Sequence, residues 1–335
     1  MNQSIDRLND VLTTKGLKAY YLVKTLRGGT AAMVHAVDDV SITVHEGEIM
    51  GIAGESGCGK STLAKALYGW VNPPLQIVDG SILYHTGNET IDILQVDADR
   101  LRQIWWNVVS YIPQSSMNVL NPTMRIKDQF LNVIKTHKKD YEKEEAEATI
   151  VKHIDELGLP REVTTSFPHQ LSGGMRQRVV IALATVLDCN VVIADEPTTA
   201  LDVIVQRGIL QLLRKIQRKL NCTIVTITHD MGVHAQIADR VAVMYAGKIV
   251  ELGPVQKVFG DAQNPYTRFL ISSLPKVGDK SKKGSIGGKP PSLVRPPRGC
   301  RFSPRCPYVM EICRTTEPVY REIDTDHFAS CHLLG

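Results

Sequence analysis

Residues 54–62 read GESGCGKST, and this stretch decides the fold. It has the spacing GxxxxGKS, follows the apolar run IMGIA at 49–53 and precedes a helix-favouring run at 61–70. Glycines at this spacing let successive backbone N–H groups turn toward phosphate oxygens, and the following helix adds its positive N-terminal end. A strand, a glycine loop and a helix in this order predict a phosphate-binding loop for a nucleoside triphosphate.

Each residue of this loop has an expected contact with the nucleotide. We expect Lys60 to reach the β- and γ-phosphates and Ser61 to bind Mg²⁺. The remaining expected ATP contacts are Gly54, Glu55, Ser56, Gly57, Cys58, Gly59 and Thr62. For Cys58 we expect a side chain that points away from phosphate, and no redox role.

A second apolar strand ends in two carboxylates. Residues 191–196 read VVIADE, which places Asp195 at the carboxyl end of a buried strand, where α/β sheets bind ligands. We expect Asp195 to bind Mg²⁺ through water and Glu196 to orient and deprotonate the attacking water. The alternative is a pair of helix-start carboxylates before Pro197, which the phosphate loop upstream disfavours.

The rest of the body alternates strands with helical segments. Apolar strands are expected at 108–112, 191–194 and 223–228, and helical patterns run over 127–157, 172–187 and 206–220. Strands of nearly continuous apolar character indicate a parallel sheet that is covered on both faces. The sequence therefore predicts an α/β protein.

The composition is that of an ordinary globular protein. If the chain works at a membrane, it must dock onto a partner that spans the bilayer. Of 335 residues, 43% are hydrophobic and 22% charged, and the net charge of +4 gives no argument for nucleic acid. The chain starts with the polar run MNQSIDRLND, so no secretory signal is expected. The most apolar run, residues 179–187, is about half the length of a bilayer span.

Composition changes after residue 275. Residues 276–298 carry seven Lys or Arg against one Asp, with four Gly and four Pro, which indicates a basic linker. Four of the seven cysteines follow within the last 36 residues: Cys300, Cys306, Cys313 and Cys331. Four thiolates in a tail too small for its own core are suited to closing on a metal cluster. A Cys₄ zinc site is the alternative, because spacing does not separate the two.

Together these motifs resemble the nucleotide-binding subunit of ATP-binding cassette transporters, over roughly residues 20–274. LSGGMRQR at 171–178 resembles the family's signature motif, with Met175 where glutamine is commoner. In the family this segment caps the nucleotide held by the opposite subunit. The residues that the resemblance assigns to the partner's ATP are Ser172, Gly173, Gly174, Met175 and Asp202, the last within ALD at 200–202.

The resemblance also completes the site. It implies that Gln114 senses Mg²⁺ and contacts the membrane subunit, and that His229 contacts the γ-phosphate. Tyr21 matches the aromatic residue that stacks on adenine, with Tyr20 as the alternative. The implied catalytic residues are Glu196, His229 and Gln114, and the implied Mg²⁺ ligands are Ser61, Gln114 and Asp195.

Several stretches resemble the D-type ATPase of the dipeptide/oligopeptide importer group. They are NVLNPTMRI at 118–126, ADEPTTALDV at 194–203, NPYT at 264–267 and GCRFSPRCPYVMEIC at 299–313. In that group four cysteines at this kind of spacing (x₅, x₆ and x₁₇) hold a [4Fe–4S] cluster. The implied partners are a paralogous F-type ATPase subunit, two permease subunits and an external solute-binding protein, at the cytoplasmic face of the membrane and without nucleic acid.

The expected fold is therefore a P-loop NTPase core with an antiparallel β subdomain, a helical signature subdomain and a C-terminal Cys-rich region. Residues 15–274 form the cassette, with the helical subdomain at about 115–187, and 275–335 form the linker and Cys-rich domain. The expected function is ATP hydrolysis at a dimer interface, coupled to uptake of peptides, oligosaccharides or nickel. The alternative is a soluble clamp acting on nucleic acid or ribosomes. Such clamps carry two cassettes or a long coiled coil between their motifs, and this chain has neither.

Overall fold

A computed structural model describes residues 9–23, 31–87, 89–114, 119–138, 140–199, 201–274 and 286–335. These form two compact units. The first comprises Met1–Leu12, Val44–Glu48 and Tyr84–Thr226, and the second Thr13–Thr43, Ile49–Leu83 and Ile227–Gly335. Residues 275–285 of the predicted linker, and Asn118 and Ala200 of the motifs quoted above, lie outside the described residues.

The second unit is built on a five-stranded run of one sheet, in the order β3-β9-β10-β12-β11. The strands are β3 (Ile49–Ala53), β9 (Arg240–Tyr245), β10 (Lys248–Pro254), β11 (Tyr320–Asp324) and β12 (His327–Ser330). Strand β3 is wholly buried and pairs in parallel with β9, whereas every other pairing in this run is antiparallel. The expectation of a parallel sheet is therefore wrong for this part. The physical reason is the two-residue turn after β9, where Ala246 and Gly247 have φ of 47° and 89° and reverse the chain.

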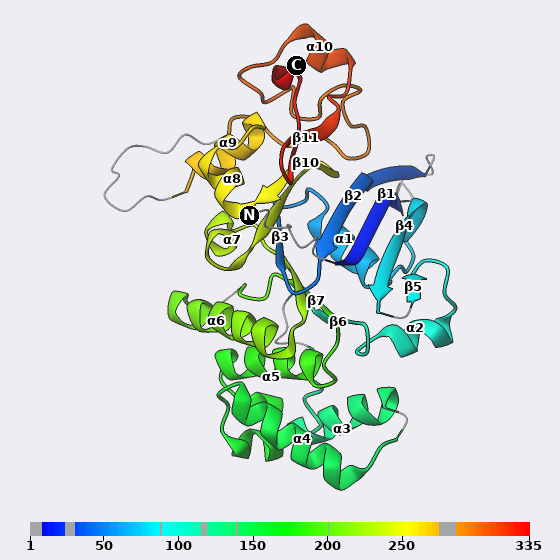
Figure 1. Ribbon diagram of the computed structural model, residues 1–335, viewed down its shortest axis with the longest axis vertical. Helices are drawn as coiled ribbons and strands as arrows, with labels where there is room; N and C mark the ends of the chain where they lie inside the picture. The colour runs from blue at the N-terminus through cyan, green and yellow to red at the C-terminus, as the bar shows by residue number, and fades with distance from the viewer. Residues whose placement is uncertain are drawn as a thin grey trace, which may run out of the picture. The chain divides into compact units, whose positions relative to one another are not determined.

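The rest of the second unit consists of a smaller sheet and short helices (Figure 1). Strands β2 (Ala32–His45), β1 (Asp10–Val23) and β4 (Leu75–Thr86) are neighbours in that order. The helices are α1 (Lys60–Leu67), α7 (Met231–Ile237), α8 (Val255–Gly260), α9 (Pro265–Ser272) and α10 (Glu311–Thr315), with a 3₁₀ turn at His332–Leu334. Helix α1 begins directly after the glycine loop, as the sequence predicts.

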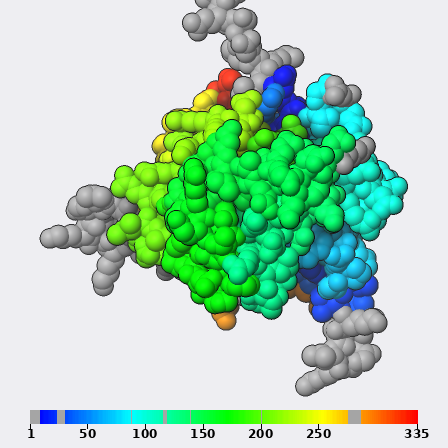
Figure 2. All heavy atoms as spheres, turned by 90° about the horizontal axis from the view of Figure 1, so that it is seen from below, coloured from blue at the N-terminus to red at the C-terminus, as the bar shows by residue number. Residues whose placement is uncertain are grey.

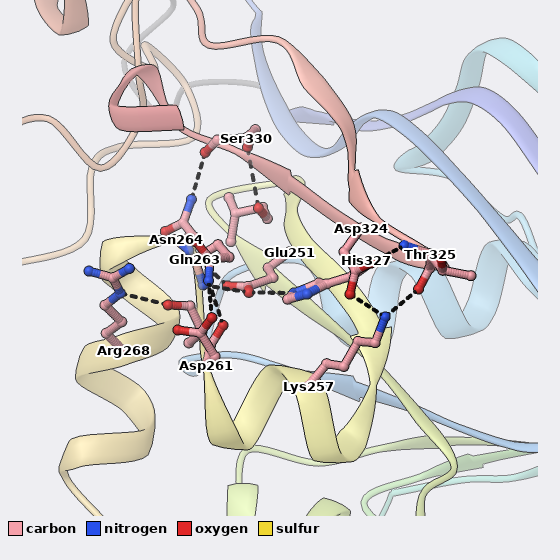
Figure 3. Close-up of polar contacts among 12 residues, drawn as sticks. Glu251, Lys257, Asp261, Gln263, Asn264, Arg268, Asp324, Thr325, His327 and Ser330 are labelled. Atoms are coloured by element: carbon pink, nitrogen blue, oxygen red, sulfur yellow. Dashed lines mark hydrogen bonds and ion pairs between the residues drawn. The ribbon is translucent and has the colours of Figure 1, made fainter. Parts of the chain in front are cut away.

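The C-terminal hairpin β11–β12 is fixed to the body of the second unit by polar contacts, some of them buried (Figure 3). The fully buried Glu251 carboxylate accepts hydrogen bonds from the backbone N–H groups of Gln263 (2.7 Å) and Asn264 (2.9 Å). Its Oε1 lies 2.8 Å from Nε2 of His327 on β12. Lys257 of α8 donates to the carbonyl oxygen of Thr325 at 2.8 Å. The cysteine-rich end of the chain is thereby part of the same sheet as β3.

The first unit carries the parallel strands β6 (Val109–Ile112) and β7 (Val191–Asp195), with β8 (Thr223–Ile227) beside β7. Its helices are α2 (Ala98–Ile104), α3 (Ile126–His137), α4 (Lys143–Glu156), α5 (Gly173–Thr185) and α6 (Val203–Leu220). Strand β5 (Glu89–Asp92) and 3₁₀ turns at Arg161–Thr165 and Pro168–Gln170 complete it. The green side chains of this helical part gather on the face seen in Figure 2. The predicted helical stretch 127–157 is thus two helices.

None of the helices in the described part of the chain combines the length and apolar character that a bilayer crossing requires.

Candidate nucleotide-binding site

The phosphate loop joins β3 to α1 through a backbone that only glycine fits at two positions. Gly54 has φ of 149°, and a Cβ there would lie 2.2 Å from the carbonyl oxygen of Met244. Gly59 has φ of 113°, and a Cβ there would lie 1.9 Å from the carbonyl oxygen of Ala36. Both values are far inside van der Waals contact, so the neighbouring backbone fixes the course of the loop at both ends.

Lys60 lies inside this loop. Its side chain is buried, and its ammonium group donates to the carbonyl oxygens of Gly54 at 2.7 Å and Glu55 at 3.0 Å. A bound phosphate oxygen would compete for the same ammonium hydrogens, and the phosphate contact expected of Lys60 stays a prediction. Cys58 is also buried, and burial raises the pKa of its thiol. The thiol is therefore neutral at physiological pH, which suits packing.

The flanks of the loop separate Tyr21 from Tyr20. The hydroxyl oxygen of Tyr21 lies 3.3 Å from Oγ1 of Thr62, at the start of α1, and the Tyr21 side chain is only half-buried. Tyr20 is buried, donates its hydroxyl hydrogen to Asp38 and lies with its ring 4.2 Å from that of His35. Because Tyr20 is engaged in the interior, Tyr21 is the better placed of the two beside the loop.

The predicted switch residue His229 lies in the second unit, between β8 and α7, and is exposed. The next residue, Asp230, caps α7 by accepting a hydrogen bond from the backbone N–H of Gly232 at 2.8 Å. Behind it, the His234 side chain is fully buried, and this burial lowers its pKa to about 4. The helix that follows His229 is thus fixed by the Asp230 cap and by the buried side chain of His234.

The first unit contains the predicted carboxylates. Asp195 is buried at the end of β7, where its Oδ2 accepts a hydrogen bond from the hydroxyl of Tyr111 at 3.0 Å. Tyr111 belongs to the neighbouring strand β6, and the sequence analysis did not single it out. Its one signal is its place three residues before Gln114, on the strand that leads to that residue. Gln114 itself lies exposed in the turn after β6.

Glu196 has an unusual backbone. Its φ of 51° lies in the left-handed region, which costs a non-glycine residue roughly 1–2 kcal/mol. Its carboxylate accepts a hydrogen bond from Oγ1 of Thr199 at 2.7 Å. Strained backbone of this kind is concentrated at active sites, where the surrounding structure holds it in place. The strain agrees with the role in hydrolysis that the sequence predicts for Glu196.

The signature residues start a helix of the first unit. Ser172 caps α5, with its Oγ accepting from the N–H of Met175 at 3.3 Å, and Gly173 and Gly174 form the first turn. A Cβ on Gly174 would lie 2.9 Å from a methyl group of Val205 on α6. Close packing of α5 on α6 therefore requires a residue without a side chain at this position.

Asp202 caps the neighbouring helix α6. Its carboxylate accepts a hydrogen bond from the backbone N–H of Val205 at 2.9 Å. The two residues that follow it, Val203 and Ile204, are 80% and 85% exposed. Two helix N-termini thus lie on neighbouring helices of this unit, and one of them carries apolar side chains that face solvent.

The four tail cysteines lie together. Cys300, Cys306, Cys313 and Cys331 all line one pocket, beside the start of α9. Burial, together with the neighbouring thiols, raises the pKa of the Cys300 thiol to about 11. Across the described residues, however, no group of three or more His, Cys, Asp or Glu side chains has an arrangement that would hold a metal ion. The predicted cluster is thus not supported by the cysteine geometry, although the four residues do converge.

Known families match this sequence in two places. The family model for ABC transporters matches residues 37–199. The model for the oligopeptide/dipeptide transporter C-terminal region matches residues 250–313. The first match includes the phosphate loop, the signature helix and both carboxylates, and the second includes three of the four tail cysteines.

Individual proteins are similar over nearly the whole chain. A dipeptide transport ATP-binding protein of Caldanaerobacter subterraneus is 40% identical, over 96% of this chain and 97% of its own length. The corresponding protein of Bacillus subtilis is 40% identical over 97% and 95%. An oligopeptide transport ATP-binding protein of Haemophilus influenzae is 40% identical over 92% of each chain.

Solved structures agree with these sequence matches. The ATP-binding cassette MJ0796, in a dimeric post-hydrolysis state bound to ADP and Pi, superposes with a TM-score of 0.61 at 25% identity. The alignment covers 73% of this chain and 98% of that one. The chain belongs to the ABC transporter ATP-binding proteins, in their oligopeptide/dipeptide group.

Proposed function

We propose that this chain is the ATP-hydrolysing subunit of an importer of dipeptides or oligopeptides, attached to the cytoplasmic face of the membrane. One observation carries the proposal: the phosphate loop and the peptide-transporter C-terminal region occur in one chain, which matches a dipeptide transport ATP-binding protein over 96% of its length. None of the relatives described above is named for oligosaccharide, nickel or nucleic acid, so we favour peptides as the solute.

The hydrolytic roles that we propose are those that the sequence motifs predict. The loop amides and Lys60 bind the phosphates, and Tyr21 stacks on adenine. Ser61, Asp195 and Gln114 hold Mg²⁺, which neutralises phosphate charge when it is bound. The buried carboxylate of Asp195, oriented by a tyrosine hydroxyl, is an oxygen donor of the kind Mg²⁺ prefers. Glu196 orients and deprotonates the attacking water, and His229 contacts the γ-phosphate.

A second ATPase subunit completes the site. Helix α5, at Ser172, Gly173, Gly174 and Met175, is proposed to cap the partner's ATP, because the N-terminus of a helix favours an anion. Asp202 precedes two exposed apolar side chains, which is expected of a surface that another subunit covers. We propose a paralogous F-type ATPase as that subunit, together with two permeases and an external solute-binding protein. A soluble clamp on nucleic acid has no observation in its favour.

For the tail we propose a [4Fe–4S] cluster on Cys300, Cys306, Cys313 and Cys331, with zinc as the alternative. The support is the single pocket that all four cysteines line. Burial opposes ionisation of three of these thiols, so a cationic group would have to supply the compensating charge. Anaerobic purification followed by iron, sulfide and zinc analysis tests this. A colourless protein with about one zinc per chain would contradict the cluster.

Replacing Glu196 by glutamine tests the ATPase role. The variant keeps the side chain's size but removes the base, so ATP binding should persist while hydrolysis falls by about 100-fold or more. Equilibrium binding of labelled ATP and steady-state phosphate release measure the two quantities. Glu162→Gln, at an exposed position of the same unit, is the control and should leave both unchanged. Undiminished hydrolysis in Glu196→Gln would refute the assigned role.

A further inference from the structure

An arginine of the cysteine-rich region reaches the phosphate loop. Arg305 precedes Cys306, and its Nη1 and Nη2 donate to the two carboxylate oxygens of Glu55 at 2.7 Å and 3.0 Å. A two-pronged pair of this kind fixes both side chains in position and orientation. The Arg305 side chain is only 4% exposed and that of Glu55 27% exposed, so solvent screens the pair less than it screens a surface ion pair.

Arg305 is itself held by further partners. Its Nε donates to the carbonyl oxygen of Gly287 at 3.0 Å, and its Nη1 also lies 3.2 Å from the hydroxyl oxygen of Tyr245. The guanidinium carbon lies 5.8 Å from the centre of the Tyr245 ring. The hydrogen bond to Glu55 raises the pKa of Arg305, which therefore stays charged at every physiological pH. The guanidinium is thus held in position by several partners while it binds Glu55 of the phosphate loop.

Glu55 uses every polar group that it has. Its backbone N–H donates to the hydroxyl of Tyr266 at 2.9 Å, its carbonyl accepts from Lys60, and its carboxylate accepts from Arg305. Phosphate binding draws Lys60 away from that carbonyl. The Glu55 carbonyl also accepts from the backbone N–H of Cys58 at 3.3 Å within the loop, so Tyr266 and Arg305 are the partners that hold this residue from outside the loop.

The segment around Arg305 is firmly packed. Phe302 is buried, with its ring 5.3 Å from that of Tyr245 and 5.5 Å from that of Tyr266. Arg301 donates to the carbonyl oxygen of Ala246, and the next residue, Gly247, donates its N–H to the carbonyl oxygen of Cys58 at 2.8 Å. The cysteine-rich region therefore supports the phosphate loop at two points.

We propose that Arg305 is a positioning residue for the phosphate loop, through which the cysteine-rich region sets the affinity for nucleotide. The inference rests on the proposed nucleotide binding and adds the cysteine-rich region, which contains none of the proposed ATP contacts. Without the guanidinium, Glu55 keeps a partly buried and uncompensated charge, and the loop entrance moves toward solvent. The loss appears in affinity, because every catalytic group is retained.

Arg305→Gln should weaken binding of MgATP and MgADP by about tenfold, a typical cost for an unpaired, partly buried charge. Arg305→Lys retains the charge but not the bidentate hydrogen bonding of the guanidinium, and should give an intermediate dissociation constant. The dissociation constants are measured by titration with a fluorescent nucleotide, and kcat at saturating ATP should stay within about twofold. The matched control is Lys257→Met, which breaks the pair with Asp324 that also holds the C-terminal hairpin.

A double-mutant cycle with Glu55→Gln separates the pair from general unfolding. Glu55→Gln alone should weaken binding about as much as Arg305→Gln, because it leaves the buried guanidinium without its carboxylate, and the two changes together should not add. Wild-type affinity in a folded Arg305→Gln variant would overturn the proposal. Equal losses in Arg305→Gln and Lys257→Met would also overturn it, since docking of the tail would then be the cause. If the wild-type protein fails to bind nucleotide, the proposed function fails instead.

Discussion

Two adjacent carboxylates at the end of β7 have different surroundings, and these suit different tasks. Asp195 is buried and accepts a hydrogen bond from the Tyr111 hydroxyl, which fixes the orientation of its carboxyl group. Glu196 is only partly buried, sits on left-handed backbone and accepts a threonine hydroxyl. Asp195 is thus suited to holding a cation, whereas Glu196 lies at the protein surface, where water has access to it.

Tyr111→Phe tests whether the Tyr111 hydroxyl orients Asp195 for metal binding. The change removes a single donor to Asp195 while the ring remains, so we expect a cost of about 1 kcal/mol in metal binding. The Mg²⁺ concentration for half-maximal ATPase activity should rise about fivefold, with little change in Tm. Magnesium titrations of phosphate release measure this. Tyr141→Phe, in the same unit, serves as the control, and an unchanged Mg²⁺ dependence in Tyr111→Phe would contradict the orientation of Asp195 by Tyr111.

Residue-level prediction from the sequence succeeds inside motifs and fails between them. Lys60 has a loop position that its spacing identifies. No sequence motif identifies Tyr111 or Arg305. Their partners, Asp195 and Glu55, lie 84 and 250 residues away in the chain. Only the folded chain brings such pairs together. The same limit applied to the choice of Tyr21 over Tyr20, which rests on a contact with Thr62.

Among the elements, the phosphate loop gives a matched pair of glycine substitutions. Both Gly57 and Gly59 have positive φ, but a Cβ on Gly57 meets nothing within 4 Å, whereas one on Gly59 meets the carbonyl oxygen of Ala36 at 1.9 Å. Gly59→Ala should abolish detectable ATP binding. Gly57→Ala should cost only about 1–2 kcal/mol of backbone strain. Nucleotide titration and thermal unfolding compare them, and equal behaviour of the two variants would argue against this steric account.

Helix α7 makes stability depend on pH. Burial lowers the pKa of His234 to about 4, below its ordinary value of about 6.5, so the unfolded chain takes up a proton before the folded one. The stabilisation is complete above about pH 6.5 and is lost as the pH falls toward 4; about 2 kcal/mol is lost by pH 5. Urea unfolding at pH 7 and pH 5 measures the difference. His234→Gln should reduce the difference in unfolding free energy between the two pH values. An unchanged difference would contradict its assignment to His234.

The elements that the sequence predicted are those with local signals. Strands β3, β7 and β8 are short apolar runs beside loops with motifs, and each is found within a residue of its expected bounds. Strands β11 and β12 lie in a Cys- and Pro-rich tail without strand periodicity. They form because Leu252 and Phe328, 76 residues apart, pair across β10 and β12. Tertiary contacts of this range leave no pattern in the local sequence.

For the whole molecule, the main consequence is the position of the C-terminal region. Composition sets residues 275–335 apart, yet the hairpin within them extends the sheet that starts at β3, and Glu251 and His327 join the two inside the protein. The cysteine-rich region therefore stands close to the phosphate loop. One chain thus combines a part that matches the ABC transporter model with a part that matches the oligopeptide/dipeptide transporter C-terminal region.

The central claim is that ATP hydrolysis by this chain drives peptide import, and uptake in proteoliposomes measures it directly. The vesicles contain both permeases and the partner ATPase, with the binding protein and a labelled oligopeptide on the binding-protein side and ATP on the other. The account predicts ATP-dependent accumulation that falls at least about tenfold when this chain carries Glu196→Gln. Accumulation that is undiminished in that variant, or that proceeds without this chain, would contradict the account.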